Sequence, residues 1–87
     1  MELSTMKNLG PVMTQKLNAV GIMSAEELVR IGSKEAFLRM KTAYPNVCHI
    51  HLYVLQGAID NVLFNLLAAD VKAELKAFSD GLAASIV

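Results

Sequence analysis

The chain has 87 residues, which is enough for one compact domain built on a single hydrophobic core. Hydrophobic residues make up 54% and charged residues 18%, so the composition excludes a disordered or low-complexity segment. Eight basic and eight acidic side chains cancel, which excludes a strong overall attraction to nucleic acid or anionic lipid. A single cysteine excludes an internal disulfide and a zinc site built on several thiolates. We therefore expect one helical domain over residues 1–87 in a reducing compartment.

The first residues contain no basic stretch followed by an apolar run, so we expect no signal peptide and a cytoplasmic location. The most apolar stretch, 47–67, contains two histidines, two asparagines and an aspartate, which argues against a membrane-spanning helix. Mean hydropathy is nonetheless +0.42, which is high for a small chain. The surplus apolar surface predicts a protein partner or a homo-oligomer, with no membrane association.

Residues 2–6 are expected to form one or two turns of helix, and a better specified helix follows. Gly10 is a suitable N-cap, and Pro11 is favoured at the first helical position because its fixed φ suits the helix. Apolar residues then recur at helical spacing: Met13, Leu17 and Val20. Gly21 followed by Ile22 is typical of a left-handed C-cap with a hydrophobic contact, so the helix is expected to end there.

Two further helices are expected next in the chain. Ser24 and Glu27 have the spacing of a capping box, in which each side chain accepts a hydrogen bond from the other residue's backbone N–H. Gly32 is expected to stop this helix. Ser33 is expected to cap a third helix that runs to about Ala43, ahead of a proline.

The longest helix is expected from Val47 to about Leu67, with Asn46 as its cap. Its main apolar stripe keeps helical spacing: Leu52, Leu55, Ile59, Val62, Leu63 and Leu66. Residues outside this stripe are the candidates for a protein interface: Ile50, Val54, Gly57 and Phe64. Gly57 costs about 1 kcal/mol relative to alanine in mid-helix, which predicts the close approach of another helix there.

A last amphipathic helix is expected over about Asp70 to Asp80, where Gly81 stops it. A short apolar tail, 82–87, follows and is expected to dock or fray. No segment shows the alternation that is typical of a strand. The predicted fold is therefore all-α: a compact bundle of five to six helices with an N-terminal helix-hairpin-helix-like motif.

The segment Met6-Lys7-Asn8-Leu9-Gly10-Pro11 resembles the turn of a helix-hairpin-helix. Unpaired amides of Val12 and Met13, at the positive end of the helix dipole, would offer a phosphate site. Asn8 stands where the usual turn has its first glycine, and asparagine tolerates a left-handed φ. The candidate nucleic-acid-binding residues are Lys7, Asn8, Leu9, Gly10, Val12, Met13 and Lys16. Because the local charge is weak, a purely packing role for the hairpin is supported at least as well.

Beyond the hairpin, the order and spacing of several short segments resemble the C-terminal domain of TfoX (Sxy), the bacterial regulator of natural competence. The resemblance covers about Met6 to Leu67 and rests on these residues: Asn8-Leu9-Gly10-Pro11, Leu17, Val20-Gly21-Ile22, Ser24 through Leu28, Gly32, Ala36, Phe37, Arg39, Met40, Leu52 through Leu55, and Gly57-Ala58. It implies an all-helical, helix-hairpin-helix-like domain associated with transcriptional control of DNA uptake. The full regulator has a separate N-terminal domain, so we expect the C-terminal domain to stand alone here.

Cys48, His49 and His51 do not have the spacing of a metal site, because helical residues two apart point to different faces. Asp60 and Tyr53 are accompanied by no nucleophile, second carboxylate or glycine-rich phosphate loop. We therefore expect a non-enzymatic interaction module without metal, cofactor or small-molecule substrate. Its expected action is protein-protein association, with weak, sequence-independent DNA binding at the hairpin as the alternative.

Overall fold

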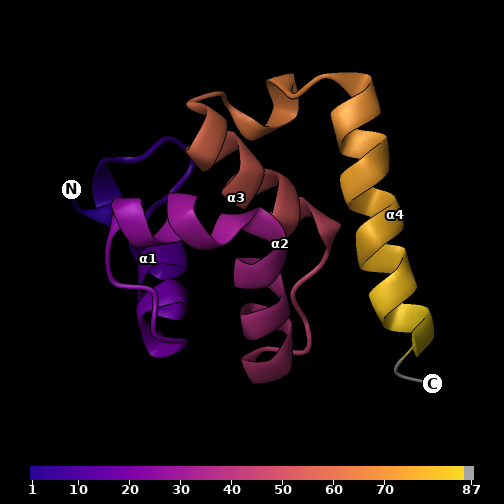
Figure 1. Ribbon diagram of the computed structural model, residues 1–87, viewed down its shortest axis with the longest axis horizontal. Helices are drawn as coiled ribbons and strands as arrows, with labels where there is room; N and C mark the ends of the chain where they lie inside the picture. Colours follow the sequence, from indigo (N-terminus) through magenta and orange to yellow (C-terminus); the bar gives the residue numbers. More distant parts are fainter. Residues whose placement is uncertain (86–87) are drawn as a thin grey trace.

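The computed structural model describes residues 1–85, with side chains through Leu82. Its elements follow in the order η1 (Leu3–Thr5), α1 (Pro11–Ala19), α2 (Ala25–Ala43), α3 (His49–Asp60), η2 (Phe64–Leu66) and α4 (Ala69–Ser85). The described residues contain no strand, which confirms the all-α class, but they form four α-helices and not the predicted five to six. Figure 1 shows α4 along one side of the molecule, with the N-terminus on the opposite side.

The core lies between α1, α2 and α3, and α4 packs against α3. Its fully buried side chains include Leu17, Ile22, Leu28, Phe37, Met40, Leu52 and Leu55. α4 adds the buried Leu75, and the hydroxyl of Tyr53 in α3 donates a hydrogen bond to the carbonyl of Lys72 in α4 at 3.1 Å. None of the helices in this part of the chain has the length and apolarity that crossing a bilayer requires.

The hairpin before α1 and the end of α1 form as their sequence predicts. Gly10 caps the helix, Pro11 takes its first position, and Gly21 has a φ of 88°. The amide of Ile22 donates to the carbonyl of Leu17 at 3.0 Å, and both side chains are fully buried. This pairing satisfies a terminal carbonyl of the helix while adding a hydrophobic contact.

The start of α2 differs from the predicted capping box in one bond. The amide of Glu27 donates to Oγ of Ser24 at 3.1 Å, as expected. The Glu27 carboxylate, however, accepts from the backbone N–H of Met23 at 2.8 Å and not from that of Ser24. The two bonds together still satisfy two backbone donors at this end of α2.

A sharp break inside α2 explains part of the difference in helix count. Gly32 has φ 87° and ψ 163°, which is outside the helical region and open to glycine at little cost. The chain resumes a helical course at Ser33, so α2 is one element with two differently directed halves. Gly32 therefore separates two helical segments where the sequence predicts a stop, although α2 counts as one element.

The predicted Val47–Leu67 helix is wrong at both ends. α3 begins at His49 with Cys48, and not Asn46, as its N-cap. It ends at Asp60 because Asn61 adopts a left-handed conformation with φ 59°. The amide of Val62 then donates to the carbonyl of Gly57 at 2.8 Å, which closes the helix end. The remaining apolar residues form a connection to α4 that contains the short 3-10 helix η2.

α4 also differs from its prediction, because it passes through Gly81 and continues to Ser85. Gly81 does not have the positive φ of a left-handed cap. Glycine inside a helix costs about 1 kcal/mol relative to alanine, and that cost alone does not end a helix with a packed face. Of the predicted tail, residues 86–87 and the side chains beyond Leu82 lie outside the described part of the chain.

The side chain of Asn8 joins the hairpin to the connection between α3 and α4. Its Nδ2 donates to the carbonyl of Val62 at 2.9 Å and, more weakly, to that of Val54 at 3.4 Å. Its Oδ1 accepts from the amide of Phe64 at 3.1 Å. Asn8 has φ 71°, so the predicted left-handed turn is confirmed. We call this set of three bonds the Asn8 clasp.

Gly57 lies directly beneath the clasp, which corrects the prediction that another helix approaches it. A Cβ at this position would lie 2.5 Å from Nδ2 of Asn8 and 2.5 Å from the carbonyl oxygen of Val62. Real Cβ atoms essentially never come so close to other heavy atoms. The glycine is required by the hairpin and the α3–α4 connection and not by helix-helix packing.

Replacing Gly57 by alanine tests this close packing. Alanine favours the helix by about 1 kcal/mol, but overpacking costs about 1–3 kcal/mol and the clasp bonds are displaced as well. We expect Gly57→Ala to lower the free energy of unfolding in urea by about 2 kcal/mol. Gly81→Ala is the matched control, because a Cβ there meets nothing within 4 Å, and it should leave stability unchanged or raise it.

Replacing Asn8 by glycine tests the clasp itself. Glycine keeps the left-handed backbone but leaves the amide of Phe64 and the carbonyl of Val62 without the side chain that pairs them. We expect Asn8→Gly to lower the free energy of unfolding by about 2–3 kcal/mol. Asn61→Gly, also at a left-handed residue, should cost less than about 1 kcal/mol. Equal effects at both positions would contradict the role given to the clasp.

Candidate functional site

The N-terminus of α1 presents the backbone donors that the sequence predicts. Gly10 is extended, with φ −87° and ψ −176°, and no side chain caps the helix. The amide of Thr14 bonds to the carbonyl of Gly10 at 3.0 Å. Within residues 1–85, the amides of Val12 and Met13 have no hydrogen-bond acceptor. Two donors at the positive end of the helix dipole therefore remain available.

Only part of the predicted nucleic-acid-binding set shares that surface. Lys7, Gly10 and Val12 are exposed, and Met13 is half-buried. Leu9 is buried in the core, and the side chain of Asn8 is held by the clasp. Lys16 has its ammonium 5.4 Å from the centroid of the Tyr44 ring, beside a different cavity. Lys7 is therefore the one cation of the predicted set at the hairpin.

The predicted interface residues are also divided between surface and interior. Ile50, at the start of α3, is 39% exposed. Val54 and Phe64 are half-buried. In the Asn8 clasp, the carbonyl of Val54 accepts a hydrogen bond and the amide of Phe64 donates one. Gly57 is buried. This side of α3 is therefore covered largely by the chain's own hairpin and connection.

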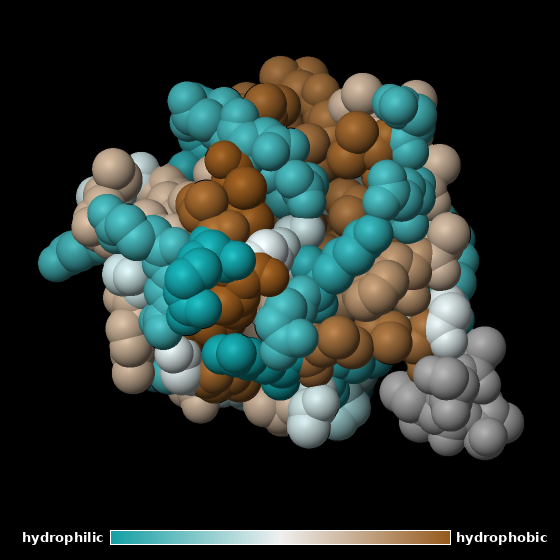
Figure 2. Space-filling model, in the orientation of Figure 1, coloured by the Kyte–Doolittle hydropathy of each residue, from teal (hydrophilic) through white to brown (hydrophobic). Residues whose placement is uncertain are grey.

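The connection between α3 and α4 instead exposes leucines that the helical pattern assigned to a buried stripe. Leu63 is 49% exposed and Leu66 is 66% exposed. Hydrophobic surface gathers at the top of the view in Figure 2, where Figure 1 shows this connection. Phe64 of the predicted interface lies between the two leucines. The one sequence signal for this arrangement is Asn61, a residue type suited to a left-handed helix end.

A second apolar area lies near the N-terminus. Met1 and Val29 are exposed and line an open cavity of about 410 Å³ with Met6 and Ala25. Methionine side chains are flexible and polarizable, which suits an adaptable contact surface. This area is distinct in sequence from the α3–α4 connection.

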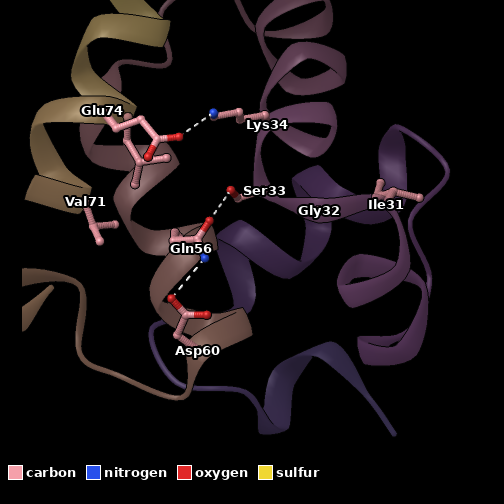
Figure 3. A pocket seen from close by; sticks show the side chains of 9 residues that line it. Ile31, Gly32, Ser33, Lys34, Gln56, Asp60, Val71 and Glu74 are labelled. Atoms are coloured by element: carbon pink, nitrogen blue, oxygen red, sulfur yellow. Dashed lines mark hydrogen bonds and ion pairs between the residues drawn. The ribbon is translucent and has the colours of Figure 1, made fainter. Parts of the chain in front are cut away.

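A polar cleft lies between α2, α3 and α4, with a volume of about 500 Å³ (Figure 3). The buried hydroxyl of Ser33 donates to Oε1 of Gln56 at 2.5 Å, and Nε2 of Gln56 donates to Asp60 at 3.0 Å. Lys34 and Glu74 form an ion pair of 2.8 Å between α2 and α4. These polar groups are paired with one another, so the cleft offers no unsatisfied side chain from among them for a ligand. The sequence predicted Ser33 only as a helix cap and assigned no role to Asp60, so this cluster of polar side chains was not predicted.

The Cys48–His51 segment forms the start of α3. Nδ1 of His51 accepts a hydrogen bond from the backbone N–H of Cys48 at 3.1 Å. Burial lowers the pKa of His51, and the positive charges of Lys16 and Lys41 lower it further. His49 packs edge-on against Tyr53, with ring centroids 5.3 Å apart. Among the described residues, no three potential ligands gather into a group that could hold a metal ion.

Comparisons with known proteins agree with this all-helical architecture. The family model described as the TfoX C-terminal domain matches residues 1–79. An uncharacterized protein from Listeria monocytogenes, in a triclinic crystal form, is 40% identical with a TM-score of 0.92, covering 95% of this chain and 94% of that one. A Listeria monocytogenes protein of unknown function, in a tetragonal form, is 41% identical with a TM-score of 0.90, covering 93% and 99% respectively.

A search of curated proteins found no match. The family match spans far more than half of the 87 residues, and it includes the hairpin, the break in α2 and the α3–α4 connection. The two Listeria structures share the fold over nearly their whole length. The chain therefore belongs to the TfoX C-terminal domain family.

Proposed function

We propose that the chain is a non-enzymatic interaction module of bacterial transcriptional regulation, related to competence, that acts in the cytoplasm through protein-protein association. Membership of the TfoX C-terminal domain family supports a regulatory role. The single observation that carries the association is the pair of exposed leucines, Leu63 and Leu66, on the α3–α4 connection. Its partner is another protein or a second copy of the chain.

The Asn8 clasp gives these leucines a defined position. A segment whose backbone is already hydrogen-bonded loses less conformational entropy on binding than a mobile loop does. Fully burying one leucine side chain stabilises a complex by about 1.5–3 kcal/mol. A few such anchors supply most of the binding energy of a protein interface, so two leucines around Phe64 are a sufficient centre for one.

Charge supports an apolar mode of association. The formal net charge is zero, and neither leucine has a charged residue next to it in the sequence. Long-range electrostatic steering is therefore weak, and the affinity should depend little on salt. An affinity that is high at low salt and falls steeply as salt is added would indicate a charged interface instead.

Substituting both leucines tests the proposal. We expect Leu63→Ser with Leu66→Ser to weaken association at least roughly tenfold, because each exposed leucine loses its burial in the complex. Sedimentation velocity across a concentration series measures self-association, and retention of partners from cell extract measures hetero-association. Thermal unfolding should change little, because about half or more of each leucine is already exposed in the free chain.

Val29→Ser is the matched control, because Val29 is apolar and 53% exposed but lies on α2. It should leave association unchanged. A wild-type chain that stays monomeric and retains no partner would contradict the proposed function. If Val29→Ser lost association while the leucine variant kept it, the assignment of the interface to Leu63 and Leu66 would be contradicted.

A second candidate function is weak, sequence-independent DNA binding at the hairpin, favoured by the two unpaired amides of α1. The amides of Val12 and Met13, with the positive end of the helix dipole behind them, suit one backbone phosphate. Lys7 is exposed and adds one positive charge. So few contacts give a low affinity that falls gently with salt.

A salt series tests this alternative. The logarithm of the DNA affinity should fall with the logarithm of salt by about 0.9 per neutralised phosphate, and Lys7→Gln should reduce that slope by about one contact. Lys76→Gln is the control, because Lys76 lies on α4 and pairs with Asp80 at 2.9 Å. Amide resonances of Val12 and Met13 that do not shift with duplex DNA at low salt would rule the alternative out.

A further inference from the structure

A small cavity of about 280 Å³ lies where α1, the end of α2 and the start of α3 meet. Lys16 comes from α1, Tyr44 and Asn46 follow α2, and His51 lies in the first turn of α3. This cavity is separate from the hairpin amides and from the exposed leucines. Neither proposed function uses it.

The cavity carries positive charge that the chain does not neutralise. Its lining residues include no aspartate or glutamate. Arg30, Lys34, Arg39 and Lys76 are each paired with a carboxylate. In the described part of the chain, no carboxylate forms an ion pair with Lys16 or with the neighbouring Lys41. Lys7 at the hairpin and Lys72 on α4 also form no ion pair within the described residues, so two of four such lysines lie beside this cavity.

The two lysines are held near the cavity in different ways. The ammonium of Lys41 donates to the carbonyls of Pro45 and Val47, at 2.8 Å each, beneath the cavity wall. That of Lys16 lies over the Tyr44 ring and has no hydrogen-bond acceptor among the described residues. An ammonium group has three donors, so Lys16 keeps its full capacity for an anion.

His51 adds a directed neutral donor. Because Nδ1 accepts the bond from the Cys48 amide, the proton of the neutral ring resides on Nε2. Burial lowers the pKa of His51 first, and Lys16 from α1 and Lys41 from α2 lower it further. The ring is therefore mostly neutral at pH 7, and a bound anion would offset the two positive charges that oppose its protonation.

We propose that this cavity binds the phosphate group of a small phosphate monoester, with Lys16 and His51 as its principal contacts and Lys41 as a fixed positive charge. A monoester carries close to two negative charges at pH 7, which matches two uncompensated lysines better than the single charge of a phosphodiester does. The cavity has room for a phosphate and a small organic body, and Tyr44 and Asn46 add polar groups to its wall.

The test is a proton NMR titration of the whole chain with inorganic phosphate and with glycerol 3-phosphate, at constant ionic strength set with sodium chloride. Resonances of the His51 ring should shift saturably, and its pKa should rise when the site is filled, because the bound anion offsets the positive charges of Lys16 and Lys41. The ring of His49, which packs on Tyr53, serves as an internal reference and should not respond. Glycerol 3-phosphate should bind at least as tightly as inorganic phosphate.

Lys16→Gln should weaken phosphate binding roughly tenfold, because it removes a charged hydrogen-bond donor. In the absence of phosphate it should also raise the pKa of His51, which shows that the folded variant has lost a positive charge at the cavity. Lys7→Gln, at the hairpin, should leave phosphate binding unchanged.

Four results would overturn the proposal. Two concern the histidines: no saturable shift at His51, or equal shifts at His49 and His51. The third is binding of inorganic phosphate but not of glycerol 3-phosphate. The fourth is a response of His51 to duplex DNA without terminal phosphates that equals its response to glycerol 3-phosphate. The last result would assign the cavity to the DNA backbone.

Discussion

The fold of this chain depends on one asparagine side chain that pairs backbone groups far away in the sequence. Asn8 bonds to Val54, Val62 and Phe64, which lie 46, 54 and 56 residues further on. Its amide supplies both the donor and the acceptor that the end of α3 and the next segment need. Half-buried backbone groups left unpaired are costly, so this side chain determines where the connection runs.

Three features follow from that pairing. Gly57 must lack a side chain, because the clasp and the carbonyl of Val62 occupy the space of a Cβ. The helix ends at Asp60, and the chain turns through the left-handed Asn61 instead of continuing. The residues beyond run as a fixed connection that exposes two leucines before α4 begins. The same bond set therefore serves stability and the proposed association surface.

The leucine surface and the cationic cavity are physically independent. The leucine surface lies on the α3–α4 connection, after the C-terminal end of α3, whereas the cationic cavity includes His51 in the first turn of that helix. α3 is 12 residues long, so its ends are about 18 Å apart. One region is apolar and depends on burial, and the other is cationic and depends on charge. A ligand in the cavity and a partner at the connection would therefore contact different side chains of the chain.

The sequence predicted the features that depend on neighbouring residues. Gly10 with Pro11, and Gly21 with Ile22, act through bonds within one turn of the chain, and both were recognised. The C-terminal end of α3 was missed because its apolar spacing continues to Leu66, while the residue that redirects the chain, Asn8, lies in the hairpin. Lys16 was assigned to the hairpin for its position in the sequence, and only the packing of α1 against the end of α2 shows its place beside Tyr44.

The most direct test of the account is native-state hydrogen exchange at the amide of Phe64, whose acceptor is the side chain of Asn8. If the clasp is part of the cooperative fold, this amide should exchange only on global unfolding, with the same free energy as the core amide of Leu55. Exchange of Phe64 through local opening, orders of magnitude faster than at Leu55, would contradict the central place given to Asn8.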